Sequence, residues 1–495
     1  MRMESRPDKN TRLIAVSNRL PVRVVQTDEG VAVRPGAGGL VTALAPVLRD
    51  RGGLWIGWSG TTFDPEHETL LRKASKRIGY GLVPVPLDSQ DIDDYYYGFS
   101  NEIIWPLFHD LQSRCRFKPR YWYRYLDVNK KFAMCIREQA SGGDYIWVHD
   151  YHLMHVAFFM RSLGLTQPTG FFLHIPFPPV DIFMKLPWRR RVLEALLQYD
   201  LIGFQTMRDK RNFLNSLGTL LPGIRIHRRG AVSDVKYDGR SVRVGAFPIS
   251  IDYKAFARDS ASKEVAEAAW YLHEALPNRQ VILGVDRLDY TKGIPERLYS
   301  FADALERFPE LRMRVSFVQV VVPSRSEVPE YQELKREIER IVGEINGRFT
   351  QSGWVPIHYL YRSLDRTQLL AYYRLAEIAL ITPLKDGMNL VCKEYCACNL
   401  EGKGVLILSE FAGAAAQLHR GALMVNPYDV EGVSETIFTA FSMTSQERAR
   451  RMKILRRAVR RKDIFWWVNT FLKAAFARNL DAFPREMAEE YVPTN

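Results

Sequence analysis

The sequence is poor in cysteine and lacks long apolar runs. Five cysteines in 495 residues are few, and their number is odd, which argues against a disulfide framework. The default is therefore a reducing compartment. No apolar run approaches the ~20 residues that a membrane-spanning helix needs. The charged residues 1–12 have no apolar core behind them, so they do not resemble a secretory signal. We therefore expect a cytoplasmic protein that is not embedded in a membrane.

Acidic residues are fewer than basic ones. Lys and Arg number 69 against 56 Asp and Glu, which leaves a net charge of +13 and favours anionic partners. Much of the excess lies in residues 447–462, where nine basic side chains accompany one acid, Glu447. The apolar spacing there predicts an amphipathic surface helix, with a nucleic-acid or acidic-surface contact as the alternative. No nucleic-acid-binding signature accompanies it, so we expect no nucleic-acid partner.

Short apolar runs alternate with helical patterns along the whole chain. Such runs, covered by helices, indicate parallel sheets buried on both faces. The runs form two series, which predict two doubly wound α/β domains that bind ligands at the carboxyl ends of their strands. The predicted strands are residues 12–18, 144–150, 169–175, 200–206 and 242–249 in the first series and 280–286, 313–322, 376–384 and 404–410 in the second.

The boundary between the two series is expected near residues 247–252, where Pro248 interrupts an apolar run. This places an N-terminal Rossmann-like domain over residues 1–248 and a C-terminal one over 249–464. The chain ends in an amphipathic, aromatic segment, so residues 465–495 are expected to pack back on the first domain.

One loop of the second series pairs two cations. Arg287 and Lys292 follow strand 280–286, and two cations five residues apart can converge on one diphosphate. The alternative is a surface loop in which Asp289 neutralises Arg287.

A second loop combines carboxylates with the start of a helix. Asp386 follows strand 376–384, and a helix that starts near Asn389 would point its first N–H groups at an anion. Asp386 and Glu394 bracket this helix start and can grip two different hydroxyl groups. The alternative is capping of the helix by Asp386, with Glu394 on a solvated face.

Other candidate motifs are weaker. The glycines of residues 36–39 open a helix and can let backbone N–H groups approach a phosphate, but on this motif alone a plain turn is favoured. His149, Asp150, His152 and His174 do not have the spacing of a common zinc site. The aromatic segments 55–58 and 94–105 can stack on sugar rings or serve as core. The three cysteines of the second series are expected to be buried thiols: Cys392, Cys396 and Cys398.

Eleven motifs in one order, from about residue 13 to about residue 470, carry a family resemblance. They closely resemble the trehalose-6-phosphate synthases, retaining glycosyltransferases of family 20 with the two-domain GT-B fold. The resemblance implies two Rossmann-like domains that face each other across a cleft. The motifs are SNRLPV, GAGGLVTAL, WIGWSG, YYYGFSNEIIWP, VHDYHLM, FFLHIPFPP, LIGFQT, GVDRLDYTKGIPERL, VVVPSRSEVPEYQEL, INGRF and TPLKDGMNLVCKEY.

The resemblance implies transfer of glucose, with retention, from a nucleotide-glucose to glucose 6-phosphate, giving trehalose 6-phosphate. UDP-glucose is the donor that we expect, although the sequence leaves uracil, guanine and adenine open as its base. The first domain is expected to bind the acceptor and the second the nucleotide sugar. No cofactor and no metal are expected, and a homo-oligomer is left open.

The resemblance also assigns roles to single residues. Those expected to bind glucose 6-phosphate are Arg19, Trp58, Tyr96, Trp105, Asp150 and Arg325, with Tyr96 and Arg325 on its phosphate. Those expected to bind the donor are Gly38, Gly39, His174, Arg287, Lys292, Asp386, Asn389, Leu390, Val391 and Glu394. Within these sets the catalytic residues are Asp150, His174, Arg287, Lys292 and Asp386.

Two alternatives to this function stay open. Glucosylglycerol-phosphate synthase shares the donor motifs but uses glycerol 3-phosphate. A catalytically silent sugar-phosphate sensor would be expected to lose donor-clamp residues, which are present here. The loop over residues 20–37 is long and resembles the eukaryotic arrangement more than the bacterial one, and the basic segment 447–462 is not a family motif.

Overall fold

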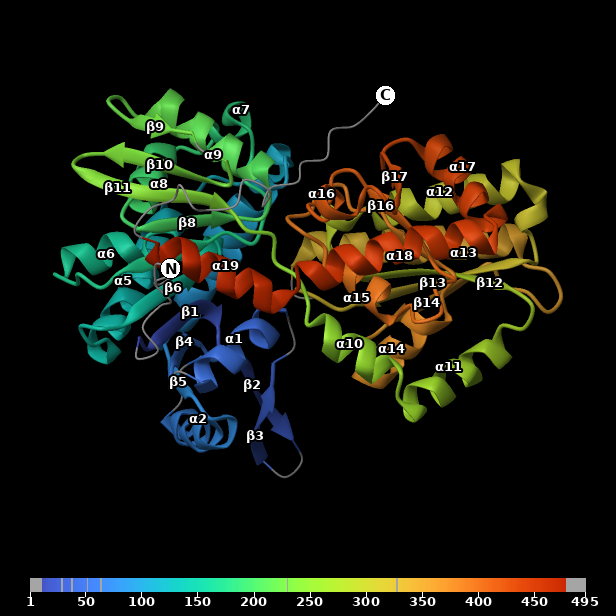
Figure 1. Ribbon diagram of the computed structural model, residues 1–495, viewed down its shortest axis with the longest axis horizontal. Helices are drawn as coiled ribbons and strands as arrows, with labels where there is room; N and C mark the ends of the chain where they lie inside the picture. The colour runs from blue at the N-terminus through green and yellow to red at the C-terminus, as the bar shows by residue number, and fades with distance from the viewer. Residues whose placement is uncertain are drawn as a thin grey trace, which may run out of the picture. The chain divides into compact units, whose positions relative to one another are not determined.

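The computed structural model describes residues 11–27, 30–36, 39–50, 52–62, 65–228, 230–325 and 328–477. The chain divides into two compact units (Figure 1). The first unit comprises the chain up to Ile249 together with the segment that begins at Phe465, and the second comprises Ser250–Ile464. In the described part, no helix combines the length and the apolar character that crossing a membrane requires.

The first unit is built on a nine-stranded sheet in the order β5-β4-β1-β6-β7-β8-β11-β10-β9. Neighbouring strands are parallel, except that β10 runs antiparallel to β9 and β11. The chain steps outward from β1 through β4 and β5, and then returns to β6 on the other side of β1. Ligands bind at such switch points. The strands are β1 (Leu13–Arg19), β4 (Leu54–Trp58), β5 (Gly81–Pro84), β6 (Tyr145–His149), β7 (Thr169–Phe172), β8 (Leu201–Phe204), β9 (Arg225–His227), β10 (Val232–Tyr237) and β11 (Arg240–Ala246).

The last described helix, α19 (Ile464–Phe476), packs on this sheet. Phe471 stacks on Trp147 of β6 with ring centroids 4.2 Å apart. The neighbouring strands carry glycines under the same ring, and a Cβ at Gly170 or Gly203 would lie 2.9 or 2.7 Å from it. These glycines therefore provide the space that lets the aromatic helix approach the sheet.

The second unit contains a six-stranded, fully parallel sheet in the order β14-β13-β12-β15-β16-β17. Its switch point lies between β12 and β15, because the chain first steps outward to β13 and β14. The strands are β12 (Gln280–Arg287), β13 (Val315–Val322), β14 (Ile357–Tyr361), β15 (Ile378–Ile381), β16 (Val405–Ser409) and β17 (Leu423–Val425).

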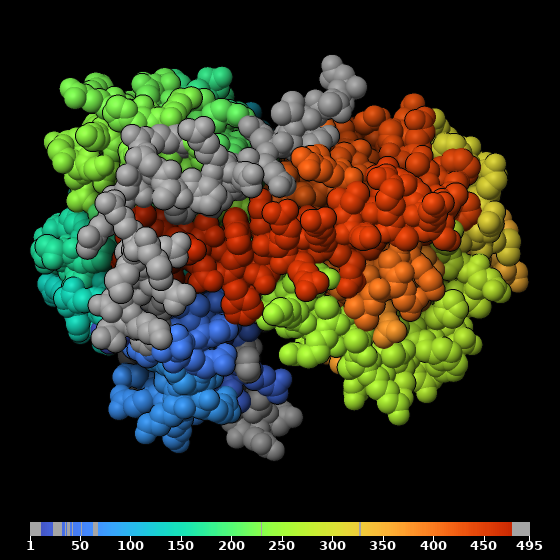
Figure 2. Space-filling view, in the orientation of Figure 1, coloured from blue at the N-terminus to red at the C-terminus, as the bar shows by residue number. Residues whose placement is uncertain are grey.

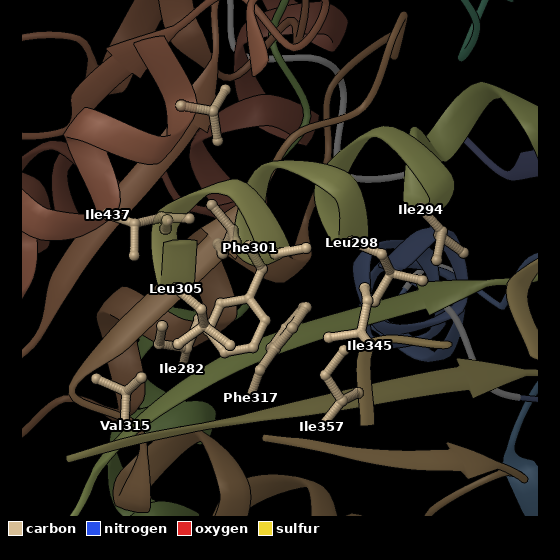
Figure 3. Close-up of a cluster of buried hydrophobic side chains, with 14 of the residues drawn as sticks. Ile282, Ile294, Leu298, Phe301, Leu305, Val315, Phe317, Ile345, Ile357 and Ile437 are labelled. Atoms are coloured by element: carbon tan, nitrogen blue, oxygen red, sulfur yellow. The ribbon is translucent and has the colours of Figure 1, made fainter. Parts of the chain in front are cut away.

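Helices α12 (Ile294–Arg307), α13 (Pro329–Phe349) and α17 (Val430–Ser442) build one core with this sheet. Figure 3 shows Leu298, Phe301 and Leu305 of α12 above the strands. The rings of Phe301 and Phe317 pack edge to face with centroids 5.2 Å apart. A second group of helices packs together elsewhere in the unit: α10 (Tyr253–Ser260), α11 (Lys263–Ala275), α14 (Arg366–Leu375), α15 (Val391–Cys398) and α18 (Ser445–Arg461).

All nine strands predicted from the sequence are present, most with ends within three residues. The prediction missed the strands that are short or amphipathic, such as β5 and β14, and it considered the aromatic run of β4 as a sugar-stacking or core segment without assigning it to a strand. It also did not foresee that part of the long 20–37 loop forms a hairpin of β2 (Val22–Thr27) and β3 (Gly30–Pro35).

Candidate functional site

In the first unit, a cation lies on aromatic rings at the end of β1. Arg19 ends this strand, and its guanidinium carbon lies 4.0 Å from the ring centroid of Trp58 and 5.4 Å from that of Tyr96. The two rings meet edge to face at 5.6 Å. Gly60 has a φ of +100°, and a Cβ there would lie 2.3 Å from Nη1 of Arg19. The rings thus hold an exposed guanidinium in place by cation–π attraction.

Tyr96 is carried by an unusual element, the 13-residue π-helix η1 (Ile92–Ile104). The π-helix is rare and occurs mostly as short bulges, frequently at functional sites. The neighbouring Tyr95 anchors it to β1 by donating its hydroxyl to Oδ1 of Asn18 at 2.8 Å. Tyr96 stacks on His152 at 5.9 Å. His152 was not among the predicted binding residues, and only its position two residues after Asp150 could have indicated this contact.

Trp105 is part of the same aromatic region but has other neighbours. It is buried, and its ring contacts those of His109 at 4.3 Å and Tyr151 at 5.9 Å. Tyr151 in turn packs on His152 at 3.9 Å. The rings of Tyr151 and His152 therefore connect Trp105 to Tyr96 of the Arg19 cluster.

Asp150 and His174 are brought together at the ends of β6 and β7. Asp150 has a φ of +76°, and a carboxylate oxygen of Asp150 accepts the His174 backbone N–H at 3.3 Å. His174 shares a hydrogen bond with His149 at 3.2 Å between Nε2 and Nδ1. Burial lowers the pKa of His174 to about 3. Burial, with His174 beside it, also holds the pKa of His149 well below its usual range. Both imidazoles are therefore neutral near pH 7.

In the second unit, Lys292 and Asp386 meet at the switch point of the sheet. Nζ of Lys292 lies 2.6 Å from Oδ2 of Asp386, and both side chains are largely buried. Asn389, with a φ of +75°, donates its side-chain amide to the same carboxylate oxygen at 3.3 Å. Gly413 allows the Asp386 loop to lie close, because a Cβ there would lie 1.9 Å from the Gly387 carbonyl oxygen.

The structure contradicts the alternative in which Asp386 caps helix α15. Asp386 does not cap the helix; instead, Oδ1 of Asn389 accepts the Cys392 N–H at 3.1 Å. The helix begins at Val391, two residues after the predicted start. The first N–H groups of a helix have no partner within it, so the amides of Leu390 and Val391 are suited to an anion.

Glu394 does not lie on a solvated face, contrary to the second part of that alternative. It is partly buried and accepts the hydroxyl of Tyr373 at 2.8 Å. Burial raises the pKa of the Glu394 carboxyl. Tyr373 was missed by the sequence prediction, because its position within α14 carries no signal beyond that of a core aromatic residue.

The loop after β12 is not a simple surface loop. Asp289 is buried and accepts the backbone N–H of Thr291 at 3.0 Å and the hydroxyl of Tyr331 at 3.1 Å. Arg325, with a φ of +48°, lies 3.5 Å from Oδ2 of Asp289. Burial favours the neutral acid, but Arg325 and Lys292 outweigh it, so the pKa of Asp289 lies below its usual value. Arg287 ends β12 with an exposed side chain.

Arg297 supports this loop from the core. Its side chain is 1% exposed and pairs with the buried Asp286. It also donates to Oγ1 of Thr382 at 3.0 Å and to the Lys292 carbonyl oxygen at 3.2 Å. Arg297 therefore joins the ends of β12 and β15 to Lys292, two residues before the start of α12. A single Arg within an amphipathic helical pattern gave no sequence signal for this role.

The remaining predictions concern the three cysteines, the glycines before α1 and a metal site. Cys392, Cys396 and Cys398 are fully buried, as predicted, and burial raises the pKa of Cys392 to about 12. Gly39 begins α1 (Gly39–Asp50), whereas Gly38 lies outside the described residues. Among the residues that the structure describes, no group of three or more His, Cys, Asp or Glu side chains is arranged to hold a metal ion.

Two doubly wound units with polar groups at their switch points agree with the GT-B class of glycosyltransferases, and solved structures with this fold match the chain. A trehalose-phosphate synthase (UDP-forming) from Burkholderia xenovorans, in complex with glucose 6-phosphate, is 34% identical with a TM-score of 0.84 and covers 94% of this chain and 99% of its own. An E. coli protein bound with UDP-2-fluoro glucose is 36% identical, with the same TM-score and coverage.

This chain belongs to glycosyltransferase family 20, whose family model matches residues 11–476. The trehalose-6-phosphate synthase of Mycobacterium leprae is 44% identical over 468 residues, covering 93% of this chain and 94% of that protein. A bifunctional synthase/phosphatase of Thermoproteus tenax is 43% identical over 472 residues, covering 93% of this chain and 63% of that protein. The family resemblance inferred from the motifs is confirmed.

Proposed function

We propose that this chain is a retaining glucosyltransferase that moves glucose from UDP-glucose to glucose 6-phosphate and releases trehalose 6-phosphate and UDP. The observation that carries the proposal is the cluster of Lys292, Asp386 and Asn389 at the start of α15. It joins a cation, a carboxylate and helix-start amides at one switch point, which are the groups that a sugar diphosphate needs.

The second unit takes the donor. Lys292 and the more exposed Arg287 bind the diphosphate together with the amides of Leu390 and Val391. Asp386 accepts hydrogen bonds from glucose hydroxyls. When the bond to the anomeric carbon breaks, negative charge grows on the leaving diphosphate. Positive groups that are already in position stabilise this charge, and removing one such contact typically costs ~3 kcal/mol.

Glu394 takes the ribose of the donor. A carboxylate accepts hydrogen bonds from ribose hydroxyls, and the Tyr373 hydroxyl already orients one of its oxygens. Burial raises the pKa of Glu394, and a carboxyl group accepts hydrogen bonds in either protonation state.

The first unit takes glucose 6-phosphate. The Arg19 guanidinium is held on Trp58 and next to Tyr96, so that it needs little reordering when the acceptor binds. Tyr96, together with Arg325 of the second unit, contacts the acceptor phosphate, and Trp105 belongs to the aromatic support. Relatives with the same fold have been crystallised with glucose 6-phosphate and with UDP-2-fluoro glucose, which supports this pair of substrates.

The sugars react next to Asp150 and His174. Neutral His174 can exchange a hydrogen bond with a glucose hydroxyl without placing a positive charge near the anomeric carbon. The φ of +76° at Asp150 is a conformation that non-glycine residues rarely adopt, and such strain clusters at functional sites. The acceptor hydroxyl attacks from the face that the diphosphate leaves, and a departing phosphate oxygen accepts its proton.

A matrix of donors and acceptors tests the proposal. Purified protein is offered UDP-, GDP- and ADP-glucose, each with glucose 6-phosphate or glycerol 3-phosphate, and the products are separated and weighed by mass spectrometry. We expect trehalose 6-phosphate as the main product with UDP-glucose. Turnover with glycerol 3-phosphate alone would instead identify a glucosylglycerol-phosphate synthase, and no turnover with any pair would identify a sugar-phosphate sensor.

A further inference from the structure

A basic hollow of about 410 Å³ lies in the second unit, at a place that the proposed reaction does not use. It is formed by α18, the start of α10 and the turn that follows α15. Figure 2 shows α18, in orange-red, on the face turned to the viewer. The residues that line it are Tyr253, Leu400, Glu401, Gly402, Ala449, Met452, Lys453, Arg456, Arg457 and Arg460.

The positive charges of α18 are not distributed evenly. Near its start, Arg450 and Arg451 each lie 2.7 Å from a carboxylate oxygen of Glu447. On the turns that line the hollow, Lys453, Arg457 and Arg460 are exposed and have no carboxylate partner among the described residues. The net positive charge of the helix is therefore concentrated at the hollow.

The acid in the lining does not neutralise this charge. Glu401 is paired with Lys403 at 2.6 Å, and the Lys403 contact lowers the pKa of the Glu401 carboxyl. The negative charge of Glu401 is therefore compensated by Lys403 and not by the basic residues of α18.

The floor of the hollow is apolar and fixed. Met452 is fully buried and Tyr253 is 8% exposed. The Arg456 guanidinium lies 5.8 Å from the Tyr253 ring. Arg456 also donates to the carbonyl oxygens of Ala397 and Asn399 at the end of α15. An already ordered guanidinium above an aromatic floor loses little entropy when it binds an anion.

We propose that this hollow binds a phosphate monoester carried by a small molecule. Its volume lies in the range of small-molecule sites, ~300–1,000 Å³, and one aromatic ring with several basic groups suits a phosphate attached to a ring-sized body. A nucleic acid would call for a basic stripe with interleaved aromatic side chains, whereas here the charges surround a hollow.

Binding has a consequence for α15. Arg456 contacts carbonyl groups at the C-terminal end of this helix, where a cation is stabilising, and the donor site of the proposed function lies at its N-terminal end. A phosphate that binds Arg456 in its present position compensates part of its positive charge, which weakens that support and lowers donor affinity. This consequence rests on the proposed function, whereas binding of the phosphate does not.

Calorimetry on the full chain tests the binding step. Inorganic phosphate, a hexose monophosphate other than the substrate and a nucleoside monophosphate are titrated separately into the wild type and into the variants R457E and R460E. R461E is the matched control, because Arg461 is exposed on the same helix but does not line the hollow. UDP is titrated into every variant to verify that the donor site is intact.

We expect at least one of the three probes to bind the wild type and R461E, and to bind R457E and R460E at least ~10-fold more weakly. UDP affinity should be equal in all three variants. The proposal would be overturned if no probe bound the wild type, or if R461E lost as much affinity as R457E and R460E. It would also be overturned if duplex DNA, but no phosphate monoester, bound in an Arg457-dependent way. An inactive protein that still bound the probe would contradict the proposed function alone.

Discussion

The two candidate half-sites hold their ligands by different means. In the first unit, Arg19 lies on aromatic rings, and neighbouring contacts are mostly ring to ring. In the second unit, ion pairs and hydrogen bonds join three loops, which follow β12, β13 and β15; the residues are Asp289 and Lys292, Arg325, and Asp386. The first arrangement suits a sugar that must be oriented, and the second suits a diphosphate that must leave with its charge stabilised.

This difference predicts where each unit is sensitive to substitution. Charged groups that are partly buried depend on each other, so that removal of one leaves its partner uncompensated. Aromatic surfaces lose contact area gradually. We therefore expect the largest effects of single substitutions in the second unit and smaller, substrate-specific effects in the first.

The largest effect is expected at Arg297. Replacing it with Met leaves the buried Asp286 without its cation, which typically costs 3–5 kcal/mol of stability, or about 4 here. Thermal unfolding measures this loss. The double variant D286N/R297M removes both charges and should recover part of the stability. Equal stability of R297M and the wild type would contradict the supporting role of this pair.

At Lys292, we expect a loss of turnover rather than of folding. K292A should lower turnover with UDP-glucose by ~10²-fold or more, because the leaving diphosphate loses a positive contact. R287A should act in the same direction. The exposed Lys254 offers a control, since K254A removes the same charge from the same unit. Activity of K292A within a few-fold of K254A would remove this lysine from the mechanism.

In the first unit, R19A should act on the acceptor alone. We expect the KM for glucose 6-phosphate to rise roughly 10-fold, because a charge-assisted contact is lost, while the KM for the donor stays the same. Steady-state kinetics with each substrate varied separate the two. R225A, on an exposed strand of the same unit, should change neither constant. A rise in both constants for R19A would show that the two half-sites are not specialised in this way.

The neutral histidines of the first unit predict a loss of stability in acid. The pKa of His174 is lowered by burial from 6.5 to about 3, so the unfolded chain takes up a proton at a pH where the folded chain does not. Above pH 6.5 His174 is neutral in both states and does not affect the free energy of unfolding. Between pH 6.5 and about 3 that free energy falls with the pH, by about 1.4 kcal/mol per pH unit. Unfolding midpoints at a series of pH values should show H174Q with a shallower slope than the control H227Q, which replaces an exposed histidine at the end of β9 in the same unit.

The smallest effect is expected from chelation. Family resemblance implies that charge on the diphosphate is stabilised by side chains and amides, so EDTA should leave the initial rate unchanged. A rate that fell with EDTA and returned with Mg²⁺ would show that the second unit relies on an added cation.

Much of this comparison could be predicted from the sequence, because it rests on local patterns. Apolar runs gave the strands, and the positions of Lys292, Asp386 and Asn389 directly after strands gave the donor cluster. Contacts between distant segments carried no such signal. Tyr331 and Tyr373 reach Asp289 and Glu394 from separate helices. The sequence also does not predict that η1 is a π-helix, because aromatic side chains at these positions suit an α-helix equally well.

A crystal structure of the full chain with UDP and glucose 6-phosphate tests the central claim most directly. The account predicts the UDP diphosphate within hydrogen-bond distance of Lys292, Arg287 and the amides at the start of α15. It also predicts the acceptor next to Arg19, Trp58 and Tyr96. Diphosphate bound elsewhere, with the Lys292–Asp386 pair undisturbed and distant from it, would contradict the account.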